Sequence, residues 1–150
     1  MGLSLYTDET FMREALKEAG KAFEQDEVPV GAVVVCDNQI VARSHNATEQ
    51  LTDSTAHAEM QALTAAMNYL RSKYLNECTL FVTLEPCAMC AGALYWSQIG
   101  KIVYAAADEK RGFRTVSDKI LHPATALVAG PFEKESRTLL QTFFQKKRES

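Results

Sequence analysis

The chain has 150 residues, the size of one ordinary domain, and 47% of them are hydrophobic while 23% are charged. Glycine and proline are sparse, at 7 and 4 residues, so the composition excludes disordered and fibrous proteins. The formal net charge of −3 counts, though only as a weak signal, against nucleic acid as a partner.

The first residues contain neither a basic segment nor a continuous apolar stretch, so we expect no secretory signal. No run approaches the roughly 18 apolar residues of a membrane-spanning helix, and we expect no membrane partner. These features predict a cytoplasmic protein, in which cysteines stay reduced. A C-x-x-C pair then indicates metal binding or redox activity rather than a disulfide.

The first half of the chain predicts a helix, a β-hairpin and a second helix. Thr7 or Asp8 can cap the first helix. Its apolar face carries Phe11, Ala15, Leu16, Ala19 and Phe23. Residues 30–36 and 39–45 predict the hairpin, with a tight turn at Asp37-Asn38. After a polar loop, Thr55 is the expected cap of a helix over residues 57–70. Its apolar positions are Met60, Leu63, Ala66, Met67 and Leu70.

The second half predicts further strands separated by helices. Residues 78–84 predict a strand, and Pro86 suits the first turn of a helix that Gly100 would end. Residues 101–107 predict another strand, 108–123 are irregular and polar, and 126–129 form a short apolar run. After the Gly130-Pro131 break, a last amphipathic helix would use Leu139, Leu140, Phe143 and Phe144.

This order predicts an α/β protein with one mixed sheet of about five strands and helices on its faces. The sheet would start with an antiparallel hairpin and continue through parallel crossovers. Because no repeat, linker or low-complexity segment interrupts the chain, we expect residues 1–150 to form a single domain.

Two short motifs suggest a metal site. Cys87 and Cys90 fall in the first turn of a predicted helix, where positions i and i+3 share a face. The helix N-terminus favours thiolates, which suits zinc. Thirty residues upstream, His57 opens another predicted helix. Three protein ligands would leave the fourth zinc position for water, which is the arrangement of a catalytic site.

Glu59 follows His57 by two residues, close enough to reach the zinc-bound water without ligating zinc. Two thiolates partly neutralise the zinc charge, so a general base is needed beside the water, and Glu59 fits that role. The pattern H-x-E followed by P-C-x-x-C matches the known signature of the zinc-dependent nucleobase deaminases. In this chemistry the glutamate, here Glu59, takes a proton from water as the water attacks an amidine-like ring carbon.

Other interpretations remain open at this point. A closed structural zinc site needs a fourth ligand, and His45 and His122 lack helpful spacing, while Cys36 and Cys78 lie in or beside strands and suit a core. A thioredoxin-like redox pair would leave His57 and Glu59 without a role. A zinc-stabilised RNA-binding module without activity is a third alternative.

The charge distribution bears on the partner. Residues 1–100 carry 6 Lys or Arg and 13 Asp or Glu, whereas residues 101–150 carry 10 and 6. The basic residues near the C-terminus, such as Lys147 and Arg148, are either a solvated helix end or a patch that contacts phosphate.

Several segments resemble one family nearly end to end. They are Glu27–Val35, Asn46, Thr55–Ala62, Glu85–Leu94, Ile99–Asp108, Leu121–Pro123 and Phe143–Arg148. On these segments the chain is similar to the bacterial tRNA-specific adenosine deaminases, which convert the wobble adenosine to inosine. The stretch Gly92–Ala106 also leans toward guanine deaminases, so deamination of guanine or another free base or nucleoside is the alternative function.

The resemblance implies a three-layer α/β/α cytidine deaminase-like fold, a homodimer and one Zn²⁺ per subunit. It places zinc on His57, Cys87 and Cys90 and makes Glu59 the proton shuttle. It further implies that a tRNA anticodon loop is bound by Asn46, Val30, Asp108, Phe143, Phe144, Lys147 and Arg148. Taken alone, Asn46 and Asp108 are also compatible with turn or cap positions, and one of the two phenylalanines is expected to pack in the core. Tyr95 and Trp96 are candidates for the dimer interface.

Overall fold

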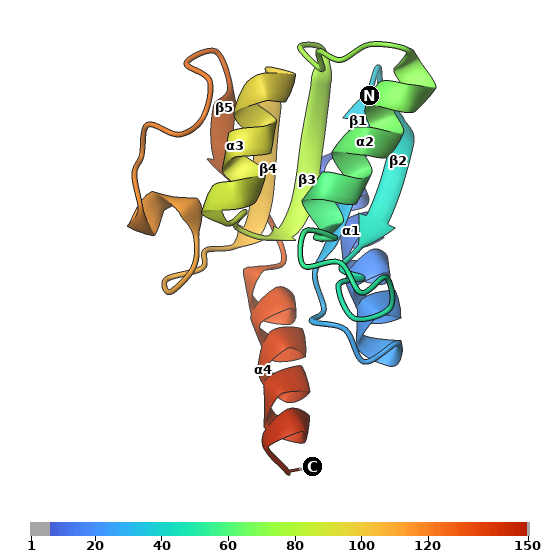
Figure 1. Ribbon diagram of the computed structural model, residues 1–150, viewed down its shortest axis with the longest axis vertical. Helices are drawn as coiled ribbons and strands as arrows, with labels where there is room; N and C mark the ends of the chain where they lie inside the picture. The colour runs from blue at the N-terminus through green and yellow to red at the C-terminus, as the bar shows by residue number, and fades with distance from the viewer. Residues whose placement is uncertain (1–6, 150) are drawn as a thin grey trace, which may run out of the picture.

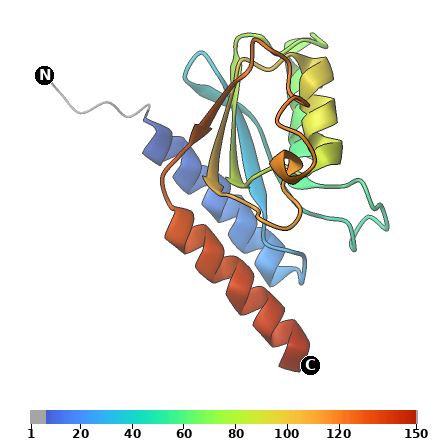
Figure 2. The ribbon, with the colours of Figure 1, turned by 90° about the vertical axis from the view of Figure 1, so that its left-hand side faces the viewer.

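The computed structural model describes residues 7–149 and has a five-stranded mixed sheet between two layers of helices (Figure 1). The strands are β1 (Gly31–Cys36), β2 (Gln39–His45), β3 (Cys78–Leu84), β4 (Lys101–Ala106) and β5 (Ala126–Ala129). The helices are α1 (Asp8–Glu24), α2 (Ala58–Leu70), α3 (Ala88–Ser97) and α4 (Glu133–Glu149), with a short 3₁₀ turn, η1 (Phe113–Thr115). The predicted three-layer α/β/α fold is confirmed: α1 and α4 lie on one face of the sheet, and α2 and α3 on the other (Figure 2).

The strands lie in the order β2-β1-β3-β4-β5. β1 pairs antiparallel with both β2 and β3, whereas β3–β4 and β4–β5 are parallel. The predicted hairpin and parallel crossovers are therefore confirmed. The hairpin turn uses Asp37 and Asn38 at φ 53° and 61°, the left-handed region that these two residue types tolerate.

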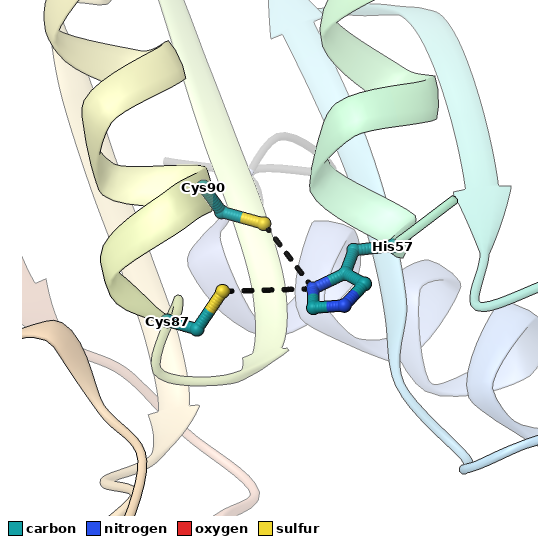
Figure 3. Close-up of side chains that lie close together, drawn as sticks. All are labelled: His57, Cys87 and Cys90. Atoms are coloured by element: carbon teal, nitrogen blue, oxygen red, sulfur yellow. Dashed lines mark hydrogen bonds between the residues drawn. The ribbon is translucent and has the colours of Figure 1, made fainter. Parts of the chain in front are cut away.

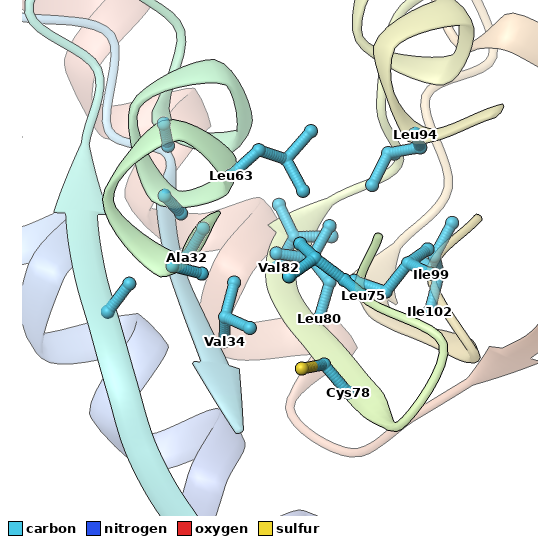
Figure 4. Packing of buried hydrophobic residues seen from close by; sticks show 14 of the residues in the cluster. Ala32, Val34, Leu63, Leu75, Cys78, Leu80, Val82, Leu94, Ile99 and Ile102 are labelled. Atoms are coloured by element: carbon cyan, nitrogen blue, oxygen red, sulfur yellow. The ribbon is translucent and has the colours of Figure 1, made fainter. Parts of the chain in front are cut away.

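Alternating side chains divide the sheet between two hydrophobic clusters. On β1, Val34 points to the cluster beneath α2 and α3, and Val33 points to the cluster beneath α1. The larger cluster also contains Leu80 and Val82 of β3, which meet Leu63 of α2 (Figure 4). This period-2 pattern explains why the strands were predictable as nearly continuous apolar runs, since both faces of the sheet are covered.

The helix termini differ in part from the sequence prediction. Thr7 caps α1 as predicted, and its hydroxyl accepts a 3.1 Å hydrogen bond from the Thr10 amide. Thr55 does not cap α2, because its side chain binds Asp53 and His57 occupies the cap position. α3 starts after Cys87, which leaves Pro86 outside the helix, and it ends at Gln98 in a left-handed conformation before Gly100. In α1 the polar Glu18 is also buried, whereas Leu16 and Phe23 are only half-buried.

The far end of the chain packs back onto the first helix. α4 continues beyond the sheet beside the end of α1, and Phe143 contacts Phe23 with 6.2 Å between ring centroids (Figure 2). None of the helices within residues 7–149 combines the length and the apolar character needed to cross a bilayer. The prediction of no secretory signal concerns the first residues, of which 1–6 lie outside the described part of the chain.

Candidate metal centre and active site

Two helix N-termini meet beside the carboxyl end of β3. His57 is the N-cap residue of α2, Cys87 is the N-cap residue of α3, and Cys90 lies in the first turn of α3. Neither cap side chain is used to cap its own helix, so both are free to point at the other helix. In Figure 3 the imidazole of His57 faces both thiols. Its Nδ1 lies 3.6 Å from Sγ of Cys87 and 3.5 Å from Sγ of Cys90.

These three side chains fit a single metal ion. Their potential ligand atoms all lie within 4.8 Å of one another. With Zn–S bonds of about 2.3 Å and a Zn–N bond of about 2.0 Å, tetrahedral geometry places nitrogen and sulfur about 3.5 Å apart. The observed separations match this edge length. One nitrogen and two sulfurs are also the donor types that zinc prefers, and three ligands leave one position open.

The surroundings favour the thiolate form of Cys87. Hydrogen bonds with Cys90 and His57, together with the charge on His57, lower the pKa of the Cys87 thiol to about 4 against the opposing effect of burial. The hydrogen bond with Cys87 raises the pKa of His57, although burial of the ring opposes this. A thiolate at the start of α3 also interacts favourably with the helix dipole. The surroundings therefore favour Cys87 as an anionic ligand for a divalent cation.

Glu59 lies beside the cluster in the wall of a cavity of about 450 Å³. Its side chain is almost completely buried, with 4% exposed, and burial raises the pKa of this carboxyl to about 7. The cavity is lined by Val28, Val30, Asn46, Thr48, His57, Ala58, Glu59, Leu84, Glu85, Cys87, Asp108 and Arg111. A carboxyl that exchanges its proton near neutral pH is suited to general acid–base chemistry.

Three of the predicted substrate residues lie together in this cavity. Asn46 and Val30 are adjacent because the Asn46 amide donates a 3.0 Å hydrogen bond to the Val30 carbonyl. Asp108 follows β4 and also lines the cavity, where its backbone amide donates a 3.1 Å hydrogen bond to Glu85. The structure thus brings Asn46, Val30 and Asp108 together with His57, Cys87 and Glu59, although they come from distant parts of the sequence.

The other four predicted substrate residues lie on α4, outside this cavity. Phe143 is 6% exposed and packs on Phe23, whereas Phe144 is 43% exposed. Lys147 forms an ion pair with Asp26 and lies over the Phe143 ring, and Arg148 is exposed. A second cavity of about 340 Å³ is lined by Phe143 and Lys147, and it shares Val28 and Thr48 with the first. The two groups of residues are therefore neighbours.

Several residues in or behind the cavity wall were not predicted as site residues. Arg111 lines the cavity, and the buried carboxylates Glu27 and Glu85 bind the loops that form its rim. Glu27 and Glu85 begin the segments Glu27–Val35 and Glu85–Leu94, in which the sequence resembles the deaminase family, and that position is the one signal that could have identified them as site residues. The position of Arg111 depends on how the segment after β4 folds, and its sequence carries no local signal for that.

Comparison with known proteins decides the family. The cytidine and deoxycytidylate deaminase zinc-binding region matches residues 5–106. A tRNA-specific adenosine deaminase of Aquifex aeolicus is 44% identical over 145 residues, which cover 93% of this chain and 95% of that protein. The chain belongs to the tRNA-specific adenosine deaminase family. This zinc deaminase therefore has one Zn²⁺ ion as its cofactor, in agreement with the donor set described above.

Two solved structures are also similar to this deaminase. One comes from a study of A-to-I editing by tRNA:A34 deaminases at the wobble position of transfer RNA. It is 39% identical with a TM-score of 0.80, and the match covers 88% of this chain and 99% of that one. The other is a guanine deaminase from Bacillus subtilis, 32% identical with a TM-score of 0.67, and the match covers 78% of each chain.

Proposed function

We propose that this deaminase converts adenosine to inosine at the wobble position, position 34, of tRNA. The observation that carries the proposal is the position of Glu59 in a cavity wall directly beside the His57, Cys87 and Cys90 cluster. The similarity to tRNA-specific adenosine deaminases over almost the whole chain supports adenosine in tRNA as the substrate.

In the proposed reaction, His57, Cys87 and Cys90 would hold one zinc ion, which would supply Lewis-acid activation of the attacking water. Glu59 accepts a proton from this water as the water oxygen bonds to C6 of the purine ring. Glu59 then delivers that proton to N1, and a second proton reaches the exocyclic amine, which leaves as ammonia. The product has a carbonyl oxygen at C6, so water is consumed and one ammonia is released per inosine formed.

The cavity and the surface next to it suit a nucleotide that has left its stack. The volume of about 450 Å³ is sufficient for one base, and Asn46, Val30 and Asp108 all line it. Bases in an anticodon loop are already unpaired, so extruding one costs less than flipping a base out of a duplex. We assign Asn46, Val30 and Asp108 to the reacting nucleotide and its neighbours.

α4 would hold the rest of the anticodon loop. Phe144 is available for stacking on a base, and Phe143 supports it from the buried side, with 5.3 Å between the two ring centroids. Lys147 lines the second cavity, and the exposed Arg148 follows it on α4, so both could meet phosphates of the loop. This division agrees with the expectation that one phenylalanine of the pair packs in the core.

We also propose that the protein is a cytoplasmic homodimer, since its substrate is tRNA and an aromatic surface is exposed on α3. Trp96 is 76% exposed and contacts Tyr95 edge to face, with 5.3 Å between the ring centroids. Large aromatic side chains are enriched at protein interfaces, and burial of Trp96 in a dimer would explain its exposure in one chain.

A direct product assay tests the proposed function. The zinc-loaded protein is incubated with an anticodon stem-loop containing A34, with a matched stem-loop containing G34, and with free guanine, adenosine and cytidine. Mass spectrometry of the products should find inosine only at position 34 of the first RNA. Xanthine from guanine, with the RNA unchanged, would instead establish the alternative that the guanine deaminase similarity supports.

A further inference from the structure

A single buried carboxylate joins the metal-binding loop to the segment after β4. Glu85 precedes Cys87 by two residues, and only 4% of it is exposed. It accepts hydrogen bonds from the backbone amides of Asp108 (3.1 Å) and Arg114 (3.2 Å). It also accepts two from the Arg114 side chain, at 3.1 Å from Nε and 2.9 Å from Nη2. Four donors thus saturate this carboxylate, and all of them come from the segment 108–114.

The same segment is attached to the metal-binding loop at two further points. Gly112 forms an isolated antiparallel bridge with Cys87, and the Phe113 amide donates a 2.9 Å hydrogen bond to the Pro86 carbonyl. The Phe113 ring is fully buried. A Cβ at Gly112 would lie 2.5 Å from the Glu85 carboxyl and from the Asp108 carbonyl, so only glycine fits there. The segment therefore packs directly on the residues that hold the cysteines.

Arg114 gives this contact its orientation. Its planar guanidinium binds Glu85 through two of its nitrogens and lies over the ring of Tyr104 on β4, 4.9 Å from the ring centroid. Paired donors and stacking on an aromatic ring are properties of arginine that lysine does not share. Arg114 thus fixes the carboxylate and the segment relative to the sheet.

The near end of the segment forms the rim of the cavity. Oδ1 of Asp108 accepts hydrogen bonds from the Lys110 amide (3.2 Å) and the Arg111 amide (3.0 Å), which closes a tight turn. Asp108 and Arg111 both line the cavity that contains Glu59. Anything that moves the turn moves these two charged side chains relative to the site of the reaction.

We propose that Arg114 is a positioning residue for the RNA substrate: by binding Glu85 it holds the turn 108–111 in place, so that Asp108 and Arg111 contact the nucleotides that flank the reacting base. This inference rests on the proposed function, because it needs a substrate larger than one base. Arg111 is exposed and cationic, and it meets the phosphate beside the extruded nucleotide. Asp108 is suited to accept hydrogen bonds from ribose hydroxyls.

The test compares Arg114→Met with the unmodified protein on the A34 stem-loop. Arg114→Met should raise KM on the order of tenfold and change kcat less than about threefold, because the interaction lost is made equally in the ground and transition states. Lys110→Met is the matched control, since it removes one positive charge from the same segment but none of the donors to Glu85. An equal rise in KM in both variants would show an effect of charge alone and overturn the proposal.

Two readouts separate positioning from direct contact with RNA. Losing a phosphate contact lowers the magnitude of the slope of log(kcat/KM) against log salt by about 1. Because Arg114 is proposed to act through Arg111, Arg114→Met should lower this slope in the unmodified protein but not lower it further in Arg111→Ala. In a double-mutant cycle with Arg111→Ala, the increase in KM of the double variant should be smaller than the product of the two single-variant increases, because Arg114 acts partly through Arg111. Fully multiplicative effects on KM, with a further decrease in slope when Arg114→Met is added to Arg111→Ala, would make Arg114 itself a phosphate contact and overturn the proposal.

Hydrogen exchange gives a readout that needs no turnover. Amides of Asp108 and Arg114 should exchange faster in Arg114→Met than in the unmodified protein, while amides of α2 stay protected. Should Arg114→Met fail to fold, Arg114→Lys keeps the charge but loses the paired contact, and it should still raise KM several-fold. Unmodified protein that leaves RNA unchanged would defeat the proposed function. Active protein whose Arg114 variants keep normal KM and normal amide exchange would defeat this inference alone.

Discussion

The carboxylate of Glu27 accepts a 3.5 Å hydrogen bond from the side-chain amide of Asn46. Both residues are buried, Glu27 just before β1 and Asn46 just after β2. Asn46 lines the first cavity and Glu27 lines the second, and Val28 and Thr48 line both. Glu27 also accepts hydrogen bonds from the backbone amides of Glu49 (3.2 Å) and Gln50 (2.7 Å). One carboxylate therefore orients the Asn46 side chain and holds the loop that follows it.

Replacing Glu27 by glutamine should disturb this loop with almost no change in volume. The amide nitrogen of the new glutamine is itself a donor, so it would face at least one of the N–H groups that now donate to the Glu27 carboxylate, and that N–H would lose its acceptor. We expect a loss of about 1–3 kcal/mol in the free energy of unfolding and a higher KM for the stem-loop. Urea denaturation and steady-state kinetics measure the two effects. Glu24→Gln, on the exposed side of α1, is the control and should match the unmodified protein.

Replacing Glu59 by glutamine should abolish turnover without loss of zinc. Glutamine fills the same buried space but cannot carry the proton, so kcat should fall by about 10³-fold or more. Product analysis by mass spectrometry and metal content by plasma mass spectrometry measure these separately. Turnover near the unmodified rate would show that Glu59 is not the proton shuttle.

Removal of zinc should destabilise the protein, since the ion binds the native arrangement of His57, Cys87 and Cys90. Free zinc at 100 times its dissociation constant stabilises a native state by about 2.7 kcal/mol. Chelation should therefore lower Tm, and added zinc should restore it. His57→Ala should start near the lower Tm and respond much less to zinc. An identical Tm with and without chelator, after metal loss is verified, would contradict the assigned ligands.

Acid should weaken the protein partly through Glu18, which is buried between α1 and β2. Burial opposes its ionisation, but hydrogen bonds with Lys21 and His45 and the charges of Lys21 and Arg43 outweigh it, so its pKa lies below the ordinary value of 4.5. The folded state then binds this proton less readily than the unfolded chain. The contribution is complete above pH 4.5 and is lost as pH falls through the lowered folded-state pKa. Urea denaturation across this range should show a shallower pH dependence for Glu18→Gln than for the unmodified protein.

Gly31→Ala should be among the most disruptive small substitutions. A Cβ at Gly31 would lie 2.1 Å from the Ala15 carbonyl oxygen and 2.4 Å from the Ala19 nitrogen, both in the α1 backbone. Forcing α1 away from β1 should cost about 1–3 kcal/mol. Gly20→Ala, within α1 and facing open space, should instead be neutral or stabilising by up to about 1 kcal/mol. Thermal unfolding of the two variants provides the comparison.

Much of the fold and of the metal cluster was predictable because the relevant signals are local. The strands have continuous apolar runs, and the spacing of Cys87 and Cys90 within one helical turn already places both sulfurs on one side. The grouping of His57 with them needed the motif as well, since that contact joins residues 30 positions apart.

The buried carboxylates were not predictable in the same way. Glu18, Glu27 and Glu85 each depend on donors from distant segments, and acidic residues outside such networks are normally solvated. The helix starts differ from the prediction by one or two residues. Thr55 binds the nearby Asp53 side chain instead of capping α2, and α3 begins after Cys87, which leaves Pro86 outside the helix. Only the structure distinguishes Phe143, which packs on Phe23, from the exposed Phe144.

The strand order has a consequence for biosynthesis. Apart from the initial hairpin, the strands lie across the sheet in the order in which they are translated. β3, β4 and β5 can each join the growing edge as they leave the ribosome, and no later strand has to insert between two that are already paired. His57, Cys87 and Cys90 all precede β4, so the nascent chain contains the complete set of proposed zinc ligands before any of the sheet's parallel pairing has formed.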